Sequence, residues 1–542
     1  MKRKLSKLVS ILIAVMIGCS LVTLPPITAE QEEVFGEGVI PETEEELEAF
    51  AKEFDQSDFS VPNTARYTLP SKVDLSTSPC FPPIGNQGGI GSCSAWSSTY
   101  YQYSYEVNKL NNVTSAADRV IYSPKWTYNN TNNGIDKGAG FTDAYKVLKN
   151  QGALTQEQFP YPTSTVYYDV QELPTYANAV RDMRDALNTR LVNYSYISIS
   201  GSDYAITSNN SELARIKLAL DGQKVLTFQT WNEFNYKYGT GNWSNTKLAY
   251  RCYDSDGSSH AMTVVGYDDN VTCDINGNGV IDAGERGAFK VINSWGLTNT
   301  GANNNGVIWI MYDALNEKST ISLDENAFSH KRKIAMGTGS ANVFNLINVA
   351  HKNVAFVAEV SFSTNYRNQA KIELGRGEVR SISGFTKQTV YNEYSGDKDK
   401  YVPYDGTMVF DFGDLANPIS KFYNGYYWRI YLSDTLKDNN NLTFKGIKIT
   451  DDRGNVINEM NEFSGKLRFD GIMYAPMVKI NFDKGDMNYN KAMDYDDYNE
   501  YANYLNRRKI SYLQRCIGDI NNNGNIDEFD ISTIKNIIFG KQ

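Results

Sequence analysis

Cysteine and histidine are scarce in this chain, and each shortage limits what the protein can be. The sequence of 542 residues contains six cysteines: Cys19, Cys80, Cys93, Cys252, Cys273 and Cys516. Loss of an N-terminal segment with Cys19 would leave five, enough for at most two disulfide bonds and one free thiol. A dense disulfide framework is therefore excluded, although the spacing does not reveal the pairing. Candidates for a catalytic imidazole are also few, namely His260, His330 and His351.

The chain also lacks an excess of basic residues and has only one long apolar run. The formal net charge of −10 argues against a nucleic-acid partner. The apolar run, residues 8–24, follows four basic residues and precedes Ala29. This pattern predicts a signal peptide over residues 1–29 and a secreted, extracellular protein with no membrane segment after cleavage. An uncleaved anchor and lipidation of Cys19 are the alternatives. The length allows two to four domains.

The residues 87–96 combine a glycine-rich approach with a cysteine at the start of an expected helix. Large apolar residues then recur at the spacing of one buried helix face: Trp96, Tyr100, Tyr103, Val107 and Leu110. Cys93 is thereby placed at a helix N-terminus, where the helix dipole favours the negatively charged thiolate. The thiolate is the reactive form of cysteine.

This stretch resembles the active-site segment of papain-like cysteine peptidases. Residues 259–267 resemble the family's histidine strand, and residues 289–296 resemble its asparagine segment. The resemblance implies an α+β, two-lobed peptidase domain over residues 70–318, mainly helical in its first half and strand-rich in its second. It implies four catalytic residues and three that bind substrate or shield the site: Cys93, His260, Asn293 and Gln87, with Gly138, Gly140 and Trp295.

The chain departs from the family pattern in two ways. Ser94 stands where the family has a tryptophan after the nucleophile. Ile90 and Ile135 stand where the family has two cysteines joined in a disulfide bond. We expect an apolar contact between these two isoleucines to replace the bond. Residues 30–69 are either a short acidic propeptide or a solvated linker, with a helix expected near residues 44–54.

Residues 319–478 have a different pattern. Short runs of β-branched and aromatic residues alternate with turn residues, which predicts a β-sandwich. Its position and the run Tyr427–Ile430 resemble the lectin-like domain of clostridial cell-surface cysteine peptidases. The domain either binds glycan or is purely structural, and Tyr427 and Trp428 are expected in its core.

The last part of the chain, residues 480–542, contains two loops with oxygen-bearing side chains at the spacing of EF-hand calcium ligands. A lysine at the sixth position of the first loop replaces the usual glycine, so this loop should bind calcium more weakly. Each loop precedes an expected helix. The first loop offers Asp486, Asn488, Asn490, Ala492, Asp494 and Asp497, and the second offers Asp519, Asn521, Asn523, Asn525, Asp527 and Asp530. Two such units resemble a dockerin, a small α-helical module whose partner is a cohesin module of a cellulosome-type scaffold.

A third loop of this kind interrupts the peptidase region between the histidine and asparagine motifs. Its expected calcium ligands are Asp274, Asn276, Asn278, Val280, Asp282 and Glu285. We expect Ca²⁺ to stiffen the hairpin that carries His260 and Asn293. An Asx-rich turn without metal is the alternative.

These features together predict a secreted cysteine endopeptidase that acts on protein or peptide substrates, needs no redox cofactor and is attached to a scaffold through its dockerin. The alternative is a catalytically inactive, peptidase-fold binding subunit of the scaffold. Ser94 and the short acidic segment keep this alternative open.

Overall fold

The protein is described by a computed structural model that covers residues 38–56, 68–162, 168–199, 211–231, 234–252, 259–299, 301–315, 321, 342–377, 385–391, 398–412, 415, 426–480, 482–506 and 509–540. The predicted signal peptide and His330 lie outside this part. The chain divides into two compact units, residues 1–34 and 35–542, and all of the described residues belong to the second. Within the residues described, no helix combines the length and the apolarity needed to cross a membrane.

A continuous helix carries Cys93 at its first residue. It consists of α3 (Cys93–Ala95), the π-helical segment η4 (Trp96–Tyr103) and α4 (Ser104–Leu110). The prediction of a single buried face is too narrow, because Tyr101 and Tyr105 are buried as well. The reason is the packing of η4, which contacts strands β3, β6 and β9 as well as helices α5 and α6.

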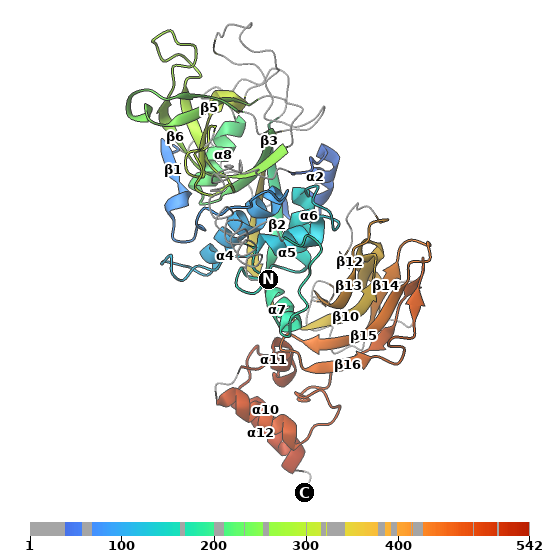
Figure 1. Ribbon diagram of the computed structural model, residues 1–542. Coiled ribbons are helices and arrows are strands. Elements are labelled where there is room, and N and C mark those ends of the chain that lie inside the picture. Colours follow the sequence, from blue (N-terminus) through green and yellow to red (C-terminus); the bar gives the residue numbers. More distant parts are fainter. Residues whose placement is uncertain are drawn as a thin grey trace, which may run out of the picture. The chain divides into compact units, whose positions relative to one another are not determined.

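This region has other helices, of which α5 and α6 pack directly on the central one (Figure 1). They are α5 (Pro124–Thr131), α6 (Phe141–Asn150), α7 (Ala179–Ala186) and α8 (Ser211–Asp221), with the 3₁₀ turn η3 (Leu75–Thr77). Ser123 caps α5 through a hydrogen bond that Trp126 N–H donates to its Oγ, and Pro124 occupies the first helical position. A further helix, α2 (Glu44–Ala51), confirms the helix expected in the acidic segment and packs on α6 and β2.

A nine-stranded sheet forms the second half of the peptidase region. Eight of its strands run in the order β2-β9-β3-β6-β7-β8-β5-β4, and β1 pairs with β6. The strands are β1 (Lys72–Asp74), β2 (Thr189–Ile199), β3 (Leu226–Trp231), β4 (Phe234–Tyr238), β5 (Lys247–Cys252), β6 (Ser259–Thr272), β7 (Arg286–Ile292), β8 (Val307–Met311) and β9 (Asn342–His351).

Strand β9 corrects the boundary that the sequence predicted at residue 318. It lies in the range assigned to the β-sandwich, yet it pairs with β2 along its whole length and with β3 at Asn345 and Phe344. The Gln102 side chain donates a hydrogen bond of 2.9 Å to the Asn345 carbonyl inside the core. The peptidase sheet is therefore completed by a strand from beyond residue 318.

Two five-stranded sheets follow, in the orders β13-β10-β15-β16 with β17 on β15, and β12-β11-β14-β18 with β19 on β14. Their strands are β10 (Phe356–Thr364), β11 (Ala370–Gly377), β12 (Thr386–Tyr391), β13 (Tyr404–Asp411), β14 (Tyr427–Asp434), β15 (Leu442–Asp451), β16 (Val456–Met460), β17 (Arg468–Phe469), β18 (Met473–Tyr474) and β19 (Met477–Lys479). Residues of both sheets share one core, and Trp428 is only 2% exposed within it. Tyr427 is on the opposite face of its strand and half-buried. The prediction that Tyr427 belongs to the core is therefore wrong.

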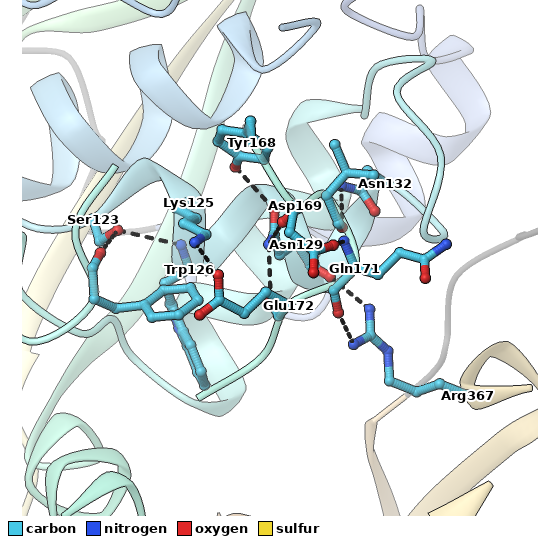
Figure 2. Close-up of polar contacts among 12 residues, drawn as sticks. Ser123, Lys125, Trp126, Asn129, Asn132, Tyr168, Asp169, Gln171, Glu172 and Arg367 are labelled. Carbon is cyan, nitrogen blue, oxygen red and sulfur yellow. Dashed lines mark hydrogen bonds and ion pairs between the residues drawn. The ribbon is translucent and has the colours of Figure 1, made fainter. Parts of the chain in front are cut away.

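Charged side chains join the β-sandwich to the peptidase region. Arg190 and Asp411 form an ion pair whose side chains are 2% and 1% exposed, and Arg184 binds Glu359 at 2.7 Å. Arg367 donates hydrogen bonds of 2.9 Å to the carbonyls of Asn129 and Gln171, as Figure 2 shows. The contacts of Arg367 reach α5 and the segment 168–172 that α5 holds in place.

The described part of the C-terminal region contains three helices, α10 (Tyr495–Leu505), α11 (Tyr512–Gly518) and α12 (Glu528–Phe539). Helices α10 and α12 follow the two predicted loops, whereas α11 was not predicted. Leu513 and Ile517 of α11 lie in the core of the β-sandwich. On α10, Tyr501 is fully buried, whereas Leu505 is 57% exposed.

Candidate active site

His260 lies on strand β6, and Asn293 directly follows the adjacent strand β7. Strands β6 and β7 pair in antiparallel register, which brings the second residue of β6 close to the residue that follows β7. His260 Nε2 and Asn293 Oδ1 are 2.7 Å apart, and both residues are fully buried. The asparagine therefore fixes the orientation of the ring through Nε2.

Trp295 covers this pair. Its ring centroid is 4.7 Å from that of His260, with the two planes inclined at 32°. An indole in this position keeps water from the His260–Asn293 hydrogen bond. The sequence had assigned this shielding role to Trp295, together with a contact to substrate.

Cys93 is fully buried and belongs to the same apolar cluster as Ala261, the residue after His260. Its helix segment α3 contacts strand β6. The structure thus brings the thiol at a helix N-terminus to the strand that carries the imidazole. The partial positive charge of that helix end favours the thiolate form of Cys93.

Gln87 is positioned by the residue that follows Asn293. Its backbone N–H donates to the Ser294 carbonyl at 2.8 Å, and its side-chain Oε1 accepts a hydrogen bond from Ser294 Oγ. Side-chain Nε2 donates to the Ile90 carbonyl at 2.8 Å. Because an amide nitrogen carries two hydrogens, this contact uses only one of its donors. Sequence reasoning did not single out Ser294, although it adjoins the asparagine.

An extended segment of the chain itself passes through the site. Gly38 N–H donates to the Ser259 carbonyl at 3.0 Å, and Ala139 N–H donates to the Gly38 carbonyl at 3.0 Å. Ile40 N–H donates to the Ala139 carbonyl at 3.2 Å, so residues 38–40 and Ala139 pair in parallel. The segment lies between the residue before His260 and the glycine-rich loop, and Val39 shares the buried cluster of Cys93.

The glycine-rich loop contacts the extended segment through Ala139 as well as through the two glycines that the sequence predicted. The backbone hydrogen bonds come from Ala139, whereas Gly138 allows the close approach. Its φ is +89°, and a Cβ added there would lie 1.5 Å from the Gly38 carbonyl oxygen. A Cβ at Gly140 would lie 3.0 Å from Glu42 Oε1. Both predicted glycines therefore line the path of the extended segment.

Glu42 anchors this segment to α6. Its carboxylate accepts a hydrogen bond from Thr142 N–H in the first turn of that helix, and the residue is 8% exposed. Burial raises the pKa of Glu42 to about 7, with smaller upward contributions from Asp143 and Glu46 and an opposing one from the Thr142 hydrogen bonds.

The two departures from the family pattern have different structural consequences. Ser94 is fully buried, and its Oγ has no hydrogen-bond partner within the described part of the chain. Ile90 packs with Ala95, Tyr128 and Ala139, and Ile135 is not part of that cluster. The expected Ile90–Ile135 contact is therefore wrong. Four cysteines of the described ranges carry thiols rather than disulfide bonds: Cys80, Cys93, Cys273 and Cys516.

The loop 274–285 connects β6 to β7, so it closes the hairpin that carries His260 and leads to Asn293. Asp274 accepts three backbone N–H groups, from Gly277, Asn278 and Gly279. Glu285 is fully buried and accepts those of Ile275, Asn276 and Asp282. The loops 486–497 and 519–530 repeat this arrangement around Asp486 and Asp497 and around Asp519 and Asp530.

Glycine or its substitute occupies the sixth position of each loop with a positive φ. The values are +82° at Gly279, +68° at Lys491 and +91° at Gly524. Lys491 thus adopts a left-handed backbone conformation that favours glycine. The resulting backbone strain destabilises the first C-terminal loop. Among the described residues no three His, Cys, Asp or Glu side chains converge as a metal site. Carboxylates alone would therefore not complete a Ca²⁺ site in these loops. Amide and backbone carbonyl oxygens would have to supply the remaining ligands.

Comparison with known proteins identifies the class of this domain. Residues 69–326 match the papain family cysteine protease. The chain therefore contains a papain-family cysteine protease domain over these residues, and the enzyme is a hydrolase of that class. The region beyond residue 326, with its β-sheets and C-terminal helices, lies outside the match.

Solved structures of cysteine proteases are similar to part of the chain. Xylellain, a cysteine protease from Xylella fastidiosa, is 23% identical, with 58% of this chain and 97% of that chain covered and a TM-score of 0.35. A procathepsin B from Trypanosoma congolense is 14% identical, with coverages of 59% and 87% and a TM-score of 0.34. No curated protein matches the chain.

Proposed function

We propose that the protein is a secreted cysteine endopeptidase in which Cys93, His260, Asn293 and Gln87 form the catalytic site. The observation that carries this proposal is the 2.7 Å contact between His260 Nε2 and Asn293 Oδ1. With Nε2 engaged by Asn293, Nδ1 is the ring nitrogen that can exchange a proton with the Cys93 thiol.

The reaction follows from these positions. The Cys93 thiolate attacks the peptide carbonyl carbon, and the carbonyl oxygen becomes an oxyanion. The Gln87 Nε2 and the Cys93 backbone N–H donate hydrogen bonds to that oxyanion. His260, as the imidazolium, gives its proton to the departing amine, and the C–N bond breaks. The imidazole then takes a proton from water, whose oxygen attacks the thioester. The C–S bond breaks, the acid is released, and the Cys93 thiolate and the His260 imidazolium are restored.

We propose further that residues 30–69 are a propeptide whose residues 38–40 block the cleft. Cys93 and His260 are both fully buried in the described structure, and the segment occupies the path that an extended substrate needs. The segment pairs with Ala139 in parallel. Its removal would be required for activity.

The reactivity of Cys93 separates an active peptidase from the catalytically inactive binding subunit. Protein freed of residues 1–68 should react at Cys93 with a peptidyl epoxide and lose activity in proportion. Cys80, a buried thiol in the same domain, serves as an internal control and should stay unmodified. An unreacted Cys93 in otherwise folded protein would favour a binding subunit instead.

For the C-terminal region we propose calcium binding by loops 486–497 and 519–530 and a dockerin that binds a cohesin module. Support comes from the repeated pattern of backbone hydrogen bonds and from the helices that begin at the end of each loop, both with reciprocal capping by Asp494–Asp497 and Asp527–Asp530. Titration with a panel of cohesins, with and without chelator, tests it. Binding to none of them in calcium would refute cohesin recognition.

The role of the β-sandwich is a separate proposal. Trp428 is buried in its core, so this tryptophan offers no platform for a sugar ring. Exposed aromatic side chains exist elsewhere on the domain, Tyr401 being 58% exposed. A glycan array probed with the full chain decides between glycan binding and a purely structural domain.

A further inference from the structure

Two loops form narrow walls around the extended segment. A Cβ added at Gly38 would lie 2.9 Å from the Gly91 carbonyl oxygen and 3.0 Å from Gly138 Cα. Gly91 precedes the nucleophile by two residues, and Gly138 belongs to the glycine-rich loop. A side chain at residue 38 would therefore clash with both loops, so only a glycine fits between Gly91 and Gly138 at this point, and a shift of either loop would change which peptide backbones fit there.

Both walls are tied to a single carboxylate oxygen. Gly91 N–H donates to Asp136 Oδ1 at 2.9 Å, and the Tyr128 hydroxyl donates to the same oxygen. Gly138 N–H in turn donates to the Tyr128 hydroxyl oxygen at 3.3 Å. One wall thus reaches Asp136 directly and the other reaches it through Tyr128.

Tyr128 is well suited to be the fixed point of this arrangement. It lies on α5, is fully buried, and packs with Ile90, Ala95 and Ala139, the last of which pairs with Val39 of the extended segment. Burial, and then the charge of Asp136, raise the pKa of Tyr128 well above its ordinary value, so the hydroxyl keeps its proton and remains a donor. Hydrogen bonds to an ionised carboxylate are among the strong ones.

We propose that Asp136, acting with Tyr128, is a positioning residue that sets the width of the cleft between Gly91 and Gly138 and so the binding of extended peptides. We call this pair the Asp136–Tyr128 clamp, because its hydrogen bonds link the two loops. Ile90 and Ile135, which adjoin Gly91 and Asp136 in the sequence, are apolar and form no covalent link between these loops. The inference rests on the proposed function, because it assumes that a substrate backbone follows the path of residues 38–40.

The test compares two thiol reagents on the active protein. A peptidyl epoxide must lie along the cleft before it reacts with Cys93, whereas iodoacetamide is small enough to need no cleft. In Asp136→Ala, the rate of inactivation by the epoxide should fall roughly 10- to 100-fold, the range expected for loss of a charged hydrogen bond. The iodoacetamide rate should change less than about twofold, and KM for peptide substrates should rise more than kcat falls.

Three further variants make the result decisive. Asp136→Asn keeps an oxygen that can accept both hydrogen bonds and should restore most of the epoxide rate. Tyr128→Phe keeps the buried ring but removes the hydroxyl and should reproduce the effect of Asp136→Ala. Lys137→Ala, at an exposed neighbouring residue, should leave both rates unchanged.

Equal losses with both reagents, an Asn variant as impaired as the Ala variant, or an unimpaired Ala variant would each overturn the proposal. If the unaltered protein reacted with neither reagent, the proposed catalytic role of Cys93 would fail first, and the clamp would fail with it. The two failures are therefore distinguishable.

Discussion

At the scale of single residues, the site depends on side chains whose partners are far away in the sequence. Gln87 is held by Ser294, and His260 by Asn293. Their identities could be predicted because each lies in a short motif of recognisable composition. Asp136 could not be predicted, since nothing in its neighbourhood indicates that Gly91, 45 positions earlier, donates to it.

Gln87→Ala should lower kcat by about 10²- to 10³-fold, the usual cost of losing one oxyanion donor. The alkylation of Cys93 by iodoacetamide should be unaffected, because no oxyanion forms in that reaction. Steady-state kinetics and the alkylation rate are the measurements. A kcat within threefold of the unaltered enzyme would show that Gln87 does not stabilise the oxyanion.

At the scale of elements, residues 38–40 and helix α2 both pack on the peptidase region. Leu47 and Phe50 of α2 are buried, and the Phe50 ring lies 4.8 Å from that of Tyr194 on β2 (centroid distance). The helix at residues 44–51 was predictable from its pattern. Its position, and the passage of residues 38–40 through the cleft, were not, because they depend on contacts with loops 100 and more residues later.

Docking of the segment should weaken as the pH rises. Burial raises the pKa of Glu42 from 4.5 to about 7, so the docked state binds its proton more tightly than the free segment does. The resulting stabilisation is complete below about pH 4.5 and is lost as the pH rises through 7.

The inhibition constant of a peptide spanning residues 38–56, measured on the processed protease, tests this dependence. The peptide should bind at least tenfold more tightly at pH 5 than at pH 8. The Glu42→Gln peptide should lose most of the difference, whereas Glu44→Gln, at an exposed position, should keep it. Tighter binding at pH 8 would contradict the expected direction of the pH dependence.

The hairpin loop 274–285 provides a second prediction at this scale. If Ca²⁺ binds there, chelation should lower the unfolding temperature of the peptidase domain and its activity together, as should Glu285→Gln. Glu157→Gln, at an exposed position outside the loop, is the control. Differential scanning calorimetry with and without chelator is the measurement. Identical transitions in both conditions would leave the loop as a metal-free turn.

At the scale of the whole molecule, the β-sandwich and the peptidase region are joined by buried charges. The sequence predicted two separate domains and a boundary near residue 318, because motifs and strand patterns are local. It could not show that β9 completes the peptidase sheet or that Arg190 meets Asp411. Such long-range partners depend on the tertiary structure, and no periodic pattern in the sequence indicates them.

Asp411→Ala should reduce the free energy of unfolding by about 3–5 kcal/mol, because Arg190 would remain buried without its carboxylate. Asp405→Ala breaks the exposed pair with Lys445, whose side chains are 67% and 40% exposed, and should cost less than about 1 kcal/mol. Chemical denaturation of both variants measures the difference. Equal effects would show that the Arg190–Asp411 pair does not stabilise the joined domains.

The most direct test of the catalytic role of Cys93 is its covalent labelling in protein freed of residues 1–68, read by mass spectrometry of the peptide that contains it. We expect stoichiometric labelling by a peptidyl epoxide, a matching loss of peptide hydrolysis, and roughly 10²-fold or greater slowing in His260→Ala, since the imidazole sets the thiolate population. An unlabelled Cys93 in folded protein, or labelling that is indifferent to His260, would contradict that role.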